Sequence, residues 1–263
     1  MSVTVQDLRA WKSEGRRFAM LTAWDYPTAR LLDEAGIPVI LVGDTLAENV
    51  LGYSTTLPVT MDAMIHHCQA VARGARNALI VGDMPFLSYQ ASLEEGVHNA
   101  GRYLKEAGAH SVKFEGPLPE FASALTRVGI PVMGHLGLTP QSVHQMGGYR
   151  VQGKTEEAAL RLIDHARELE EAGVFALVLE GVPRQLAQEV TQKVSVPTIG
   201  IGAGPDCDAQ VLVTSDLVGL SERRLAKFAK AYANIGTEIR RAAEEYRRDV
   251  EDGEFPDDEH SYH

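Results

Sequence analysis

Short apolar runs alternate with longer segments of helical periodicity through most of this 263-residue chain. Each run has the length of a buried strand, and the intervening segments are long enough to return the chain to the same edge of a parallel sheet. Eight such units predict a closed parallel (βα)8 barrel, with a doubly wound open sheet as the alternative. The expected strands are residues 18–23, 38–43, 78–82, 110–115, 131–135, 175–180, 197–201 and 211–217.

The helical pattern also predicts where the main helices and long loops lie. Two long loops are expected, at residues 44–60 and 135–154, and Ser221 is expected to cap a long charged helix that reaches about Asp249. We therefore expect a single barrel domain over residues 1–263, with a C-terminal helix and tail at about 221–263. The other expected helices are residues 25–35, 60–73, 92–107, 119–128 and 155–172.

Composition excludes several classes of protein. A formal net charge of -11 argues against nucleic acid or an anionic membrane as partner, because both require a basic face. No run approaches the roughly 18 apolar residues of a membrane span, and residues 1–17 lack an apolar signal region. Cys68 and Cys207 have neither metal-type spacing nor the number that a disulfide framework needs, so we expect a reducing, cytoplasmic location.

Ionisable residues recur where the expected strands end. Active sites of (βα)8 barrels lie at that face, so side chains at equivalent positions converge on one rim. A single Asp after a strand is more often a helix cap or turn residue, and Lys113 with Glu115 could by themselves be a buried ion pair of the core. Six such residues are harder to explain in that way. They are Asp44, Asp83, Lys113, Glu115, His135 and Glu180.

The carboxylates among them favour a hard cation. Asp44, Asp83 and Glu115 offer only oxygen ligands, which suit Mg²⁺, with Mn²⁺ or Co²⁺ as substitutes. A 2-oxo acid could chelate that ion, which would act as a Lewis acid and stabilise the enolate formed when the carbon beside the ketone loses a proton. Lys113 would neutralise the substrate and Glu180 would abstract the proton. Alternatively, Glu180 is one more metal-shell or structural carboxylate.

Several segments carry a family resemblance. The chain resembles the ketopantoate hydroxymethyltransferase family from about Leu21 to its ending FPDDEHSY at residues 255–262, and GHLGLTPQ is the most specific of the matching segments. These are LVGDT at 41–45, TLPVT at 56–60, DMPF at 83–86, VKFEG at 112–116, GHLGLTPQ at 134–141 and GIGAG at 200–204.

The resemblance implies a fold and an activity. The fold would be a (βα)8 barrel of the phosphoenolpyruvate/pyruvate superfamily. The enzyme would transfer a hydroxymethyl group from 5,10-methylenetetrahydrofolate to 3-methyl-2-oxobutanoate, giving 2-dehydropantoate in pantothenate and coenzyme A biosynthesis. It would hold one Mg²⁺ per subunit, act on a small ketoacid and a folate, and assemble as a homodecamer.

The resemblance also implies roles for individual residues. The family's proton acceptor matches Glu180. Thr45 stands where the family usually has a serine, so the hydroxyl that would hold the ketoacid carboxylate is kept and a methyl group is added. His135 could hydrogen-bond the substrate or the folate, or it could brace its loop. The implied metal residues are Asp44, Asp83 and Glu115, not all of them necessarily in direct contact, and the implied substrate-binding residues are Asp44, Thr45, Asp83, Lys113 and His135.

Two other functions compete with this one. The first is a lyase or mutase of the same superfamily, acting on a 2-oxo dicarboxylate or phosphonopyruvate. Those enzymes typically use a cysteine in a lid that follows a strand, and neither Cys68 nor Cys207 stands in such a setting. The second is a catalytically inactive barrel that serves as a binding scaffold, which is disfavoured because every candidate metal and base residue is present.

Overall fold

A closed barrel of eight parallel strands forms the centre of the fold. The computed structural model describes residues 2–221 and 225–263. The strands follow one another in chain order around the barrel, and β1 closes it by pairing with both β2 and β8. This arrangement confirms the predicted (βα)8 fold and rules out the open sheet. The strands are β1 (Phe18–Thr22), β2 (Val39–Val42), β3 (Leu79–Asp83), β4 (Ser111–Glu115), β5 (Val132–Gly137), β6 (Ala176–Glu180), β7 (Thr198–Ile201) and β8 (Ala209–Leu212).

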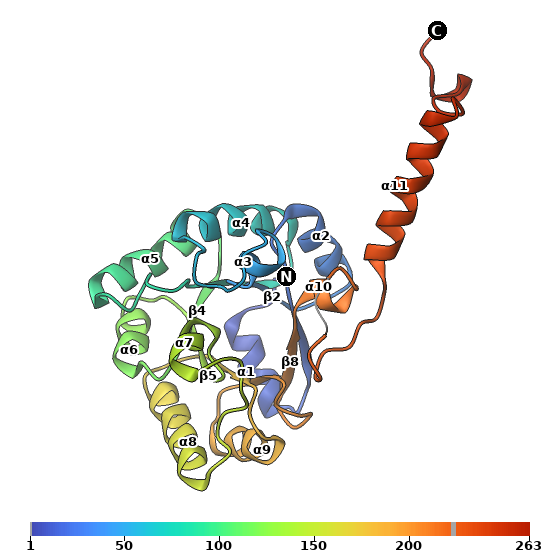
Figure 1. The fold of residues 1–263 in the computed structure, drawn as a ribbon. Helices are drawn as coiled ribbons and strands as arrows, with labels where there is room; N and C mark the ends of the chain where they lie inside the picture. The colour runs from blue at the N-terminus through green and yellow to red at the C-terminus, as the bar shows by residue number, and fades with distance from the viewer. Residues whose placement is uncertain (1, 222–224) are drawn as a thin grey trace. The chain divides into compact units, whose positions relative to one another are not determined.

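In the described part of the chain, six helices of nine or more residues follow the strands and surround them, as Figure 1 shows for the arrangement. Three of them begin where a hydroxyl side chain caps the first turn: Thr60, Ser92 and Thr155 each accept a hydrogen bond from a backbone N–H three residues later. Their start positions therefore agree with the sequence prediction. The six are α2 (Tyr26–Glu34), α4 (Met61–Gly74), α5 (Leu93–Lys105), α6 (Pro119–Arg127), α8 (Glu156–Glu171) and α9 (Arg184–Lys193).

The two predicted long loops contain short helical turns. The loop after β2 includes α3 (Leu46–Asn49), and the loop after β5 includes η1 (Pro140–Ser142) and α7 (Val143–Met146). Both loops follow the carboxyl ends of strands, so the turns order the chain beside the candidate site.

An N-terminal helix, α1 (Val5–Ser13), closes the opposite end of the barrel. Its Leu8 is fully buried in the same apolar cluster as the inward-facing strand residues. Arg9 donates a hydrogen bond to the carbonyl of Val174, just before β6, and Lys12 pairs at 2.8 Å with Asp208, just before β8. Because these partners all precede strands, α1 seals the end away from the candidate site.

Alternation along the strands decides which side chains enter the barrel. Val81 of β3, Met133 of β5 and Val178 of β6 belong to the apolar cluster inside the barrel. Two residues further along the same strands lie Asp83, His135 and Glu180, so each points to the same side. The interior is therefore apolar in the middle and ionisable at the carboxyl ends of the strands.

One expectation for the end of the barrel was wrong, namely the bounds of its last strand. Residues 202–208, all within the described part of the chain, form no helix between β7 and β8, because the segment is short and has glycines with positive φ at Gly202 and Gly204. The expected strand at 211–217 begins earlier, at Ala209, and stops at Leu212. Thr, Ser and Asp at 214–216 favour local turns over strand pairing, and they open the short helix α10 (Thr214–Leu217).

The chain divides into two compact units, residues 1–212 and 213–263. The second unit holds α10, α11 (Ile235–Glu251) and η2 (Asp258–His260). The prediction that Ser221 caps the long helix was wrong: its hydroxyl donates to Asp216, and α11 begins only at Ile235. Residues 222–224 lie outside the described part. Residues 225–234 belong to the expected helix but are not helical in the structure. Phe228 and Tyr232 of this segment are exposed, so it lacks the apolar packing that stabilises most helices.

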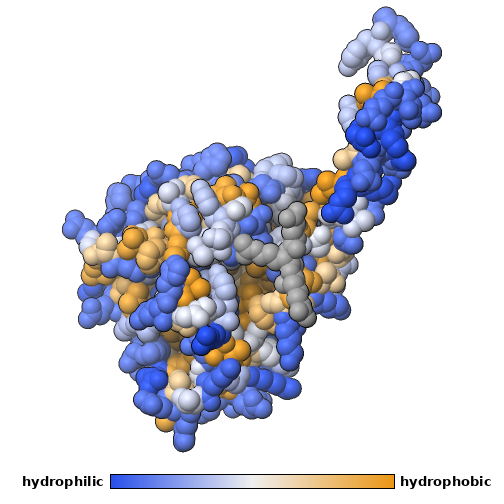
Figure 2. All heavy atoms as spheres, in the orientation of Figure 1, coloured by the Kyte–Doolittle hydropathy of each residue, from blue (hydrophilic) through white to orange (hydrophobic). Residues whose placement is uncertain are grey.

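On the face of the barrel unit that Figure 2 shows, hydrophilic side chains dominate the outline and apolar side chains are gathered between them. Among the described residues, no helix combines the length and apolar character needed to cross a membrane.

Cys68 and Cys207 are free, buried thiols, and burial raises the pKa of Cys68 to about 12.

Replacing Asp33 of α2 with Ala is expected to destabilise the barrel by about 1–3 kcal/mol, because its carboxylate accepts three backbone hydrogen bonds, from Arg76, Asn77 and Ala78. Burial raises its pKa, but these bonds outweigh burial and lower it overall. A lowered folded-state pKa means that the stabilisation is present above the unfolded pKa and is lost as the pH falls through the folded value. Urea unfolding at pH 7 and in acid measures both effects. Equal stability of wild type and Asp33→Ala at pH 7 would contradict the assignment.

Candidate functional site

Strand register brings the predicted site residues together at one end of the barrel. Asp83 of β3 pairs in register with Lys113 of β4, and Glu115 of β4 pairs with His135 of β5. Glu180 of β6 is level with Gly137, two residues beyond His135 on β5. Residues far apart in the sequence therefore form one continuous polar cluster across β3, β4, β5 and β6.

Lys113 is the central cation of this cluster. Its ammonium lies 2.7 Å from Oδ1 of Asp83 and 3.9 Å from Oε1 of Glu115, and all three side chains are buried. Burial lowers the pKa of Lys113, but the surrounding carboxylates have the larger effect, Asp83 most of all. The pKa of Lys113 is therefore raised above its usual value. The sequence placed Lys113 beside Glu115, and the structure shows that Asp83 is the closer partner.

Asp44 enters the cluster from the end of β2. Its backbone N–H donates to Oδ2 of Asp83 at 3.2 Å, and its own carboxylate accepts from Gln141. Burial and then repulsion from Asp83 and Glu115 raise the pKa of Asp44 well above its ordinary value. Burial likewise raises the pKa of Asp83, although Lys113 opposes this. The site therefore brings Asp44, Asp83 and Glu115 close together where all three are almost completely buried.

His135 lies between two carboxylates. Its Nδ1 is 3.5 Å from Oε1 of Glu115 and its Nε2 is 3.3 Å from Oε2 of Glu180, yet neither nitrogen makes a well-aligned hydrogen bond to any described residue. Burial and the Lys113 charge lower its pKa, but the two carboxylates outweigh them and raise the pKa to about 9. The same contact helps to lower the pKa of Glu115 despite its burial. The ring faces the cluster and not the neighbouring loop.

The side chain of Glu180 is more exposed to solvent than those of Asp83 and Glu115. Its side chain is 17% exposed, whereas those of Asp83 and Glu115 are 2% and 3% exposed. A group that exchanges protons with a small molecule must be reachable from outside, so this position suits a general base better than those of the buried carboxylates.

Thr45 follows Asp44 directly and immediately precedes α3. Its side chain makes no capping hydrogen bond to that helix, and the residue is half-buried. The hydroxyl is therefore not engaged in capping α3 beside Asp44.

Sequence reasoning gave no role to two further buried residues of the site. Gln141 contacts both Asp44 and Glu115, and the hydroxyl of Tyr89 contacts Gln141. Gln141 does lie in GHLGLTPQ, the most specific of the family-like segments, and that was the signal that could have found it. Nothing in the local sequence around Tyr89 indicates its position.

The donor set suits a hard divalent cation. Asp44, Asp83 and Glu115 present only oxygen, and the ammonium of Lys113 lies beside them. Among the described residues, no group of three or more His, Cys, Asp or Glu side chains forms a ready-made cage for an ion. Mg²⁺ in other proteins commonly binds through one or two carboxylates and completes its shell with water and substrate.

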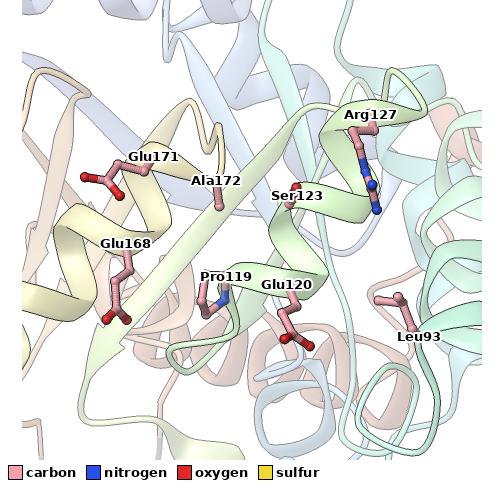
Figure 3. Close-up of a pocket in the computed structure, with 8 residues that line it drawn as sticks. All are labelled: Leu93, Pro119, Glu120, Ser123, Arg127, Glu168, Glu171 and Ala172. Atoms are coloured by element: carbon pink, nitrogen blue, oxygen red, sulfur yellow. The ribbon is translucent and has the colours of Figure 1, made fainter.

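A separate groove lies on the outer wall of the barrel, between α6 and α8 (Figure 3). It shares no residue with the buried cluster, and its charged side chains reach solvent. We assign it no part in the chemistry. Its lining residues are Leu93, Pro119, Glu120, Ser123, Arg127, Glu168, Glu171 and Ala172.

A closed (βα)8 barrel with a buried, ionisable cluster at the carboxyl ends of its strands defines a barrel enzyme. The model of the ketopantoate hydroxymethyltransferase family matches residues 2–258. The chain belongs to that family, and it is an enzyme of the hydroxymethyltransferase class.

Curated relatives agree with the family match. The chain is 54% identical over 262 residues to the 3-methyl-2-oxobutanoate hydroxymethyltransferase of Syntrophus aciditrophicus, covering 99% of this chain and 96% of that protein. It is 56% identical over 262 residues to the enzyme of the same name from Thermobifida fusca, covering 99% and 93%.

Solved structures show the same fold at low sequence identity. A phosphonopyruvate hydrolase in complex with oxalate and Mg²⁺ has a TM-score of 0.64 at 14% identity, covering 98% of this chain and 93% of that one. A 2,3-dimethylmalate lyase of the PEP mutase/isocitrate lyase superfamily has a TM-score of 0.61 at 15% identity, covering 99% and 92%. The barrel therefore has the fold of that superfamily.

Proposed function

We propose that this enzyme transfers a hydroxymethyl group from 5,10-methylenetetrahydrofolate to 3-methyl-2-oxobutanoate, giving 2-dehydropantoate for pantothenate and coenzyme A biosynthesis. The observation that carries the proposal is the cluster itself: buried Lys113 among carboxylates, with Glu180 on its more open side. The family match and the curated relatives support the same reaction. From the family likeness we also propose a cytoplasmic homodecamer.

Each residue of the cluster has its own role in the proposed reaction. Lys113 stays protonated among its carboxylates and neutralises the ketoacid, and the Thr45 hydroxyl binds the substrate carboxylate. Glu180 takes the proton from the branched carbon, which then forms a bond to the methylene carbon of the folate. The methylene carbon gives up its bonds to N5 and N10 of the folate, and water supplies the hydroxyl. One proton from water and the one taken up by Glu180 go to the two nitrogens, and tetrahydrofolate leaves. His135 stands beside Glu180 and hydrogen-bonds the bound substrate or folate from there.

The proposal includes one Mg²⁺ per subunit, held by Asp44, Asp83 and Glu115 directly or through water. When bound, the ion supplies Lewis-acid stabilisation of the charge that develops on the ketoacid oxygen. Burial, followed by repulsion from neighbouring carboxylates, raises the pKa values of Asp44 and Asp83, and an added cation would favour their charged forms. A protein of the same fold, a phosphonopyruvate hydrolase, has been solved in complex with oxalate and Mg²⁺.

Proton NMR of 3-methyl-2-oxobutanoate in D₂O tests the proposal. With the purified protein and Mg²⁺, the branched-carbon proton is expected to be lost, and a chelator is expected to stop this loss. Full turnover with methylenetetrahydrofolate then tests the one-carbon donor. Failure of both exchange and turnover, on protein shown to be folded, would refute the proposed reaction.

The structure adds an argument against a lyase or mutase that uses a lid cysteine. Cys68 is buried on α4, and Cys207 is buried just before β8, at the end of the barrel opposite the cluster. Cys68 therefore lies on a helix, and Cys207 lies at the far end of the 202–208 connection, beside the amino end of β8.

A further inference from the structure

Gln141 uses its full hydrogen-bonding capacity inside the site. Its Nε2 donates to Oδ2 of Asp44 and to the carbonyl of Met84, each at 2.9 Å. Its Oε1 accepts from the hydroxyl of Tyr89 at 2.7 Å and from Nε2 of Gln90 at 3.1 Å. The side chain is almost completely buried, so each of these bonds replaces one that water cannot supply.

The neighbours determine which way the amide faces. The Asp44 carboxylate and the Met84 carbonyl can only accept, so the NH₂ group must face them and the oxygen must face Tyr89. A Glu at this position would lack the donor and would place another carboxylate against Asp44. A neutral amide of this length meets both requirements.

The backbone of Gln141 completes the contact with a second carboxylate. Its N–H donates to Oε2 of Glu115 at 3.0 Å. One residue therefore holds Oδ2 of Asp44 and Oε2 of Glu115, while Oε1 of Glu115 faces Lys113 and His135. The side chain and the backbone together set the relative placement of two carboxylates that come from different strands.

Tyr89 supports this arrangement from the loop after β3. Its hydroxyl donates to Gln141 and accepts from the backbone N–H of Glu115 at 3.1 Å. Its ring stacks on Phe121 and contacts Phe114, so the hydroxyl is held in place by apolar packing. The loops that follow β2, β3 and β5 are thereby joined through one amide.

We infer that Gln141, held by Tyr89, is a positioning residue that fixes the carboxylates of Asp44 and Glu115 in the geometry that binds a divalent cation. This inference rests on the proposed function, because it assigns the residue to the cation site of that reaction. These bonds hold one oxygen of each carboxylate, Oδ2 of Asp44 and Oε2 of Glu115. Loss of the amide releases Asp44 to turn, which weakens its binding of a cation.

Two variants test this role. Gln141→Met keeps the length of the side chain but removes its donor and acceptor, and Tyr89→Phe removes only the hydroxyl. The readout is the Kd for Mn²⁺, measured by electron paramagnetic resonance on folded protein without substrate or folate. Gln141→Met is expected to raise this Kd roughly 10- to 100-fold, the range seen when the groups that orient metal ligands are removed. Tyr89→Phe is expected to raise it less.

The double variant and controls separate positioning from a general loss of structure. Because Tyr89 acts partly through Gln141, the double variant is expected to raise the Kd by less than the product of the two single effects. Gln69→Met on α4 and Tyr26→Phe on α2 change the same residue types outside the site and are expected to leave the Kd at the wild-type value. If Gln141→Met does not fold, the Kd of Tyr89→Phe for Mn²⁺ is the test of the positioning role.

The outcomes distinguish this inference from the proposed function. Wild-type Mn²⁺ binding with an unchanged Kd in Gln141→Met and Tyr89→Phe would overturn the positioning role and leave the proposed reaction standing. A wild-type protein that binds no Mn²⁺ and exchanges no substrate proton would remove the proposed cation site, and the inference would fall with it.

Discussion

Replacing Glu180 with Gln is expected to slow deuterium exchange at the branched carbon of 3-methyl-2-oxobutanoate by roughly 10²-fold or more, because removal of a general base commonly costs this much. The amide has nearly the same size as the carboxylate but cannot take up the proton. Glu180 is also the carboxylate of the cluster that solvent reaches most easily. The rate is measured by proton NMR in D₂O at saturating ketoacid.

A second Glu→Gln variant controls for the loss of a negative charge. Glu168 lies on α8 in the outer groove, away from the cluster (Figure 3). Glu168→Gln is expected to exchange deuterium at the wild-type rate. Exchange retained at the wild-type rate in Glu180→Gln would move the role of base to another residue.

Replacing Asp83 with Ala is expected to abolish metal-dependent activity and to destabilise the barrel. The change removes a proposed cation ligand and the closest partner of Lys113, which would keep only the contact to Glu115 at 3.9 Å. Breaking a buried ion pair from one side costs about 3–5 kcal/mol, because it leaves a buried charge unpaired. Turnover with and without Mg²⁺ and urea unfolding measure the two effects.

Asp83→Asn separates the two consequences. It keeps the side-chain volume and an oxygen that can accept from Lys113, so its loss of stability is expected to be smaller than that of Asp83→Ala. Its loss of activity is expected to remain large, since a neutral amide oxygen is a weaker ligand for Mg²⁺ than a carboxylate. Full activity of Asp83→Ala in metal-stripped buffer would contradict the metal role of this residue.

The sequence alone predicted the barrel and the face that holds the site. Strand residues alternate between the inside and the outside, so the pattern that buries Val81 and Val178 also directs Asp83 and Glu180 inward at the ends of the same strands. This is local periodicity, which can be read without knowing what each strand pairs with. The family resemblance added the reaction, which residue chemistry alone did not specify.

The tertiary structure decided which of these groups touch one another. Lys113 pairs more closely with Asp83 of the neighbouring strand than with Glu115 of its own strand. Gln141 reaches Asp44, which is 97 positions away in the chain. Such contacts depend on the register and closure of eight strands, which no local pattern contains. The local pattern of the sequence therefore predicted which residues would meet at one end of the barrel. Only the folded chain determined which of them bond to one another there.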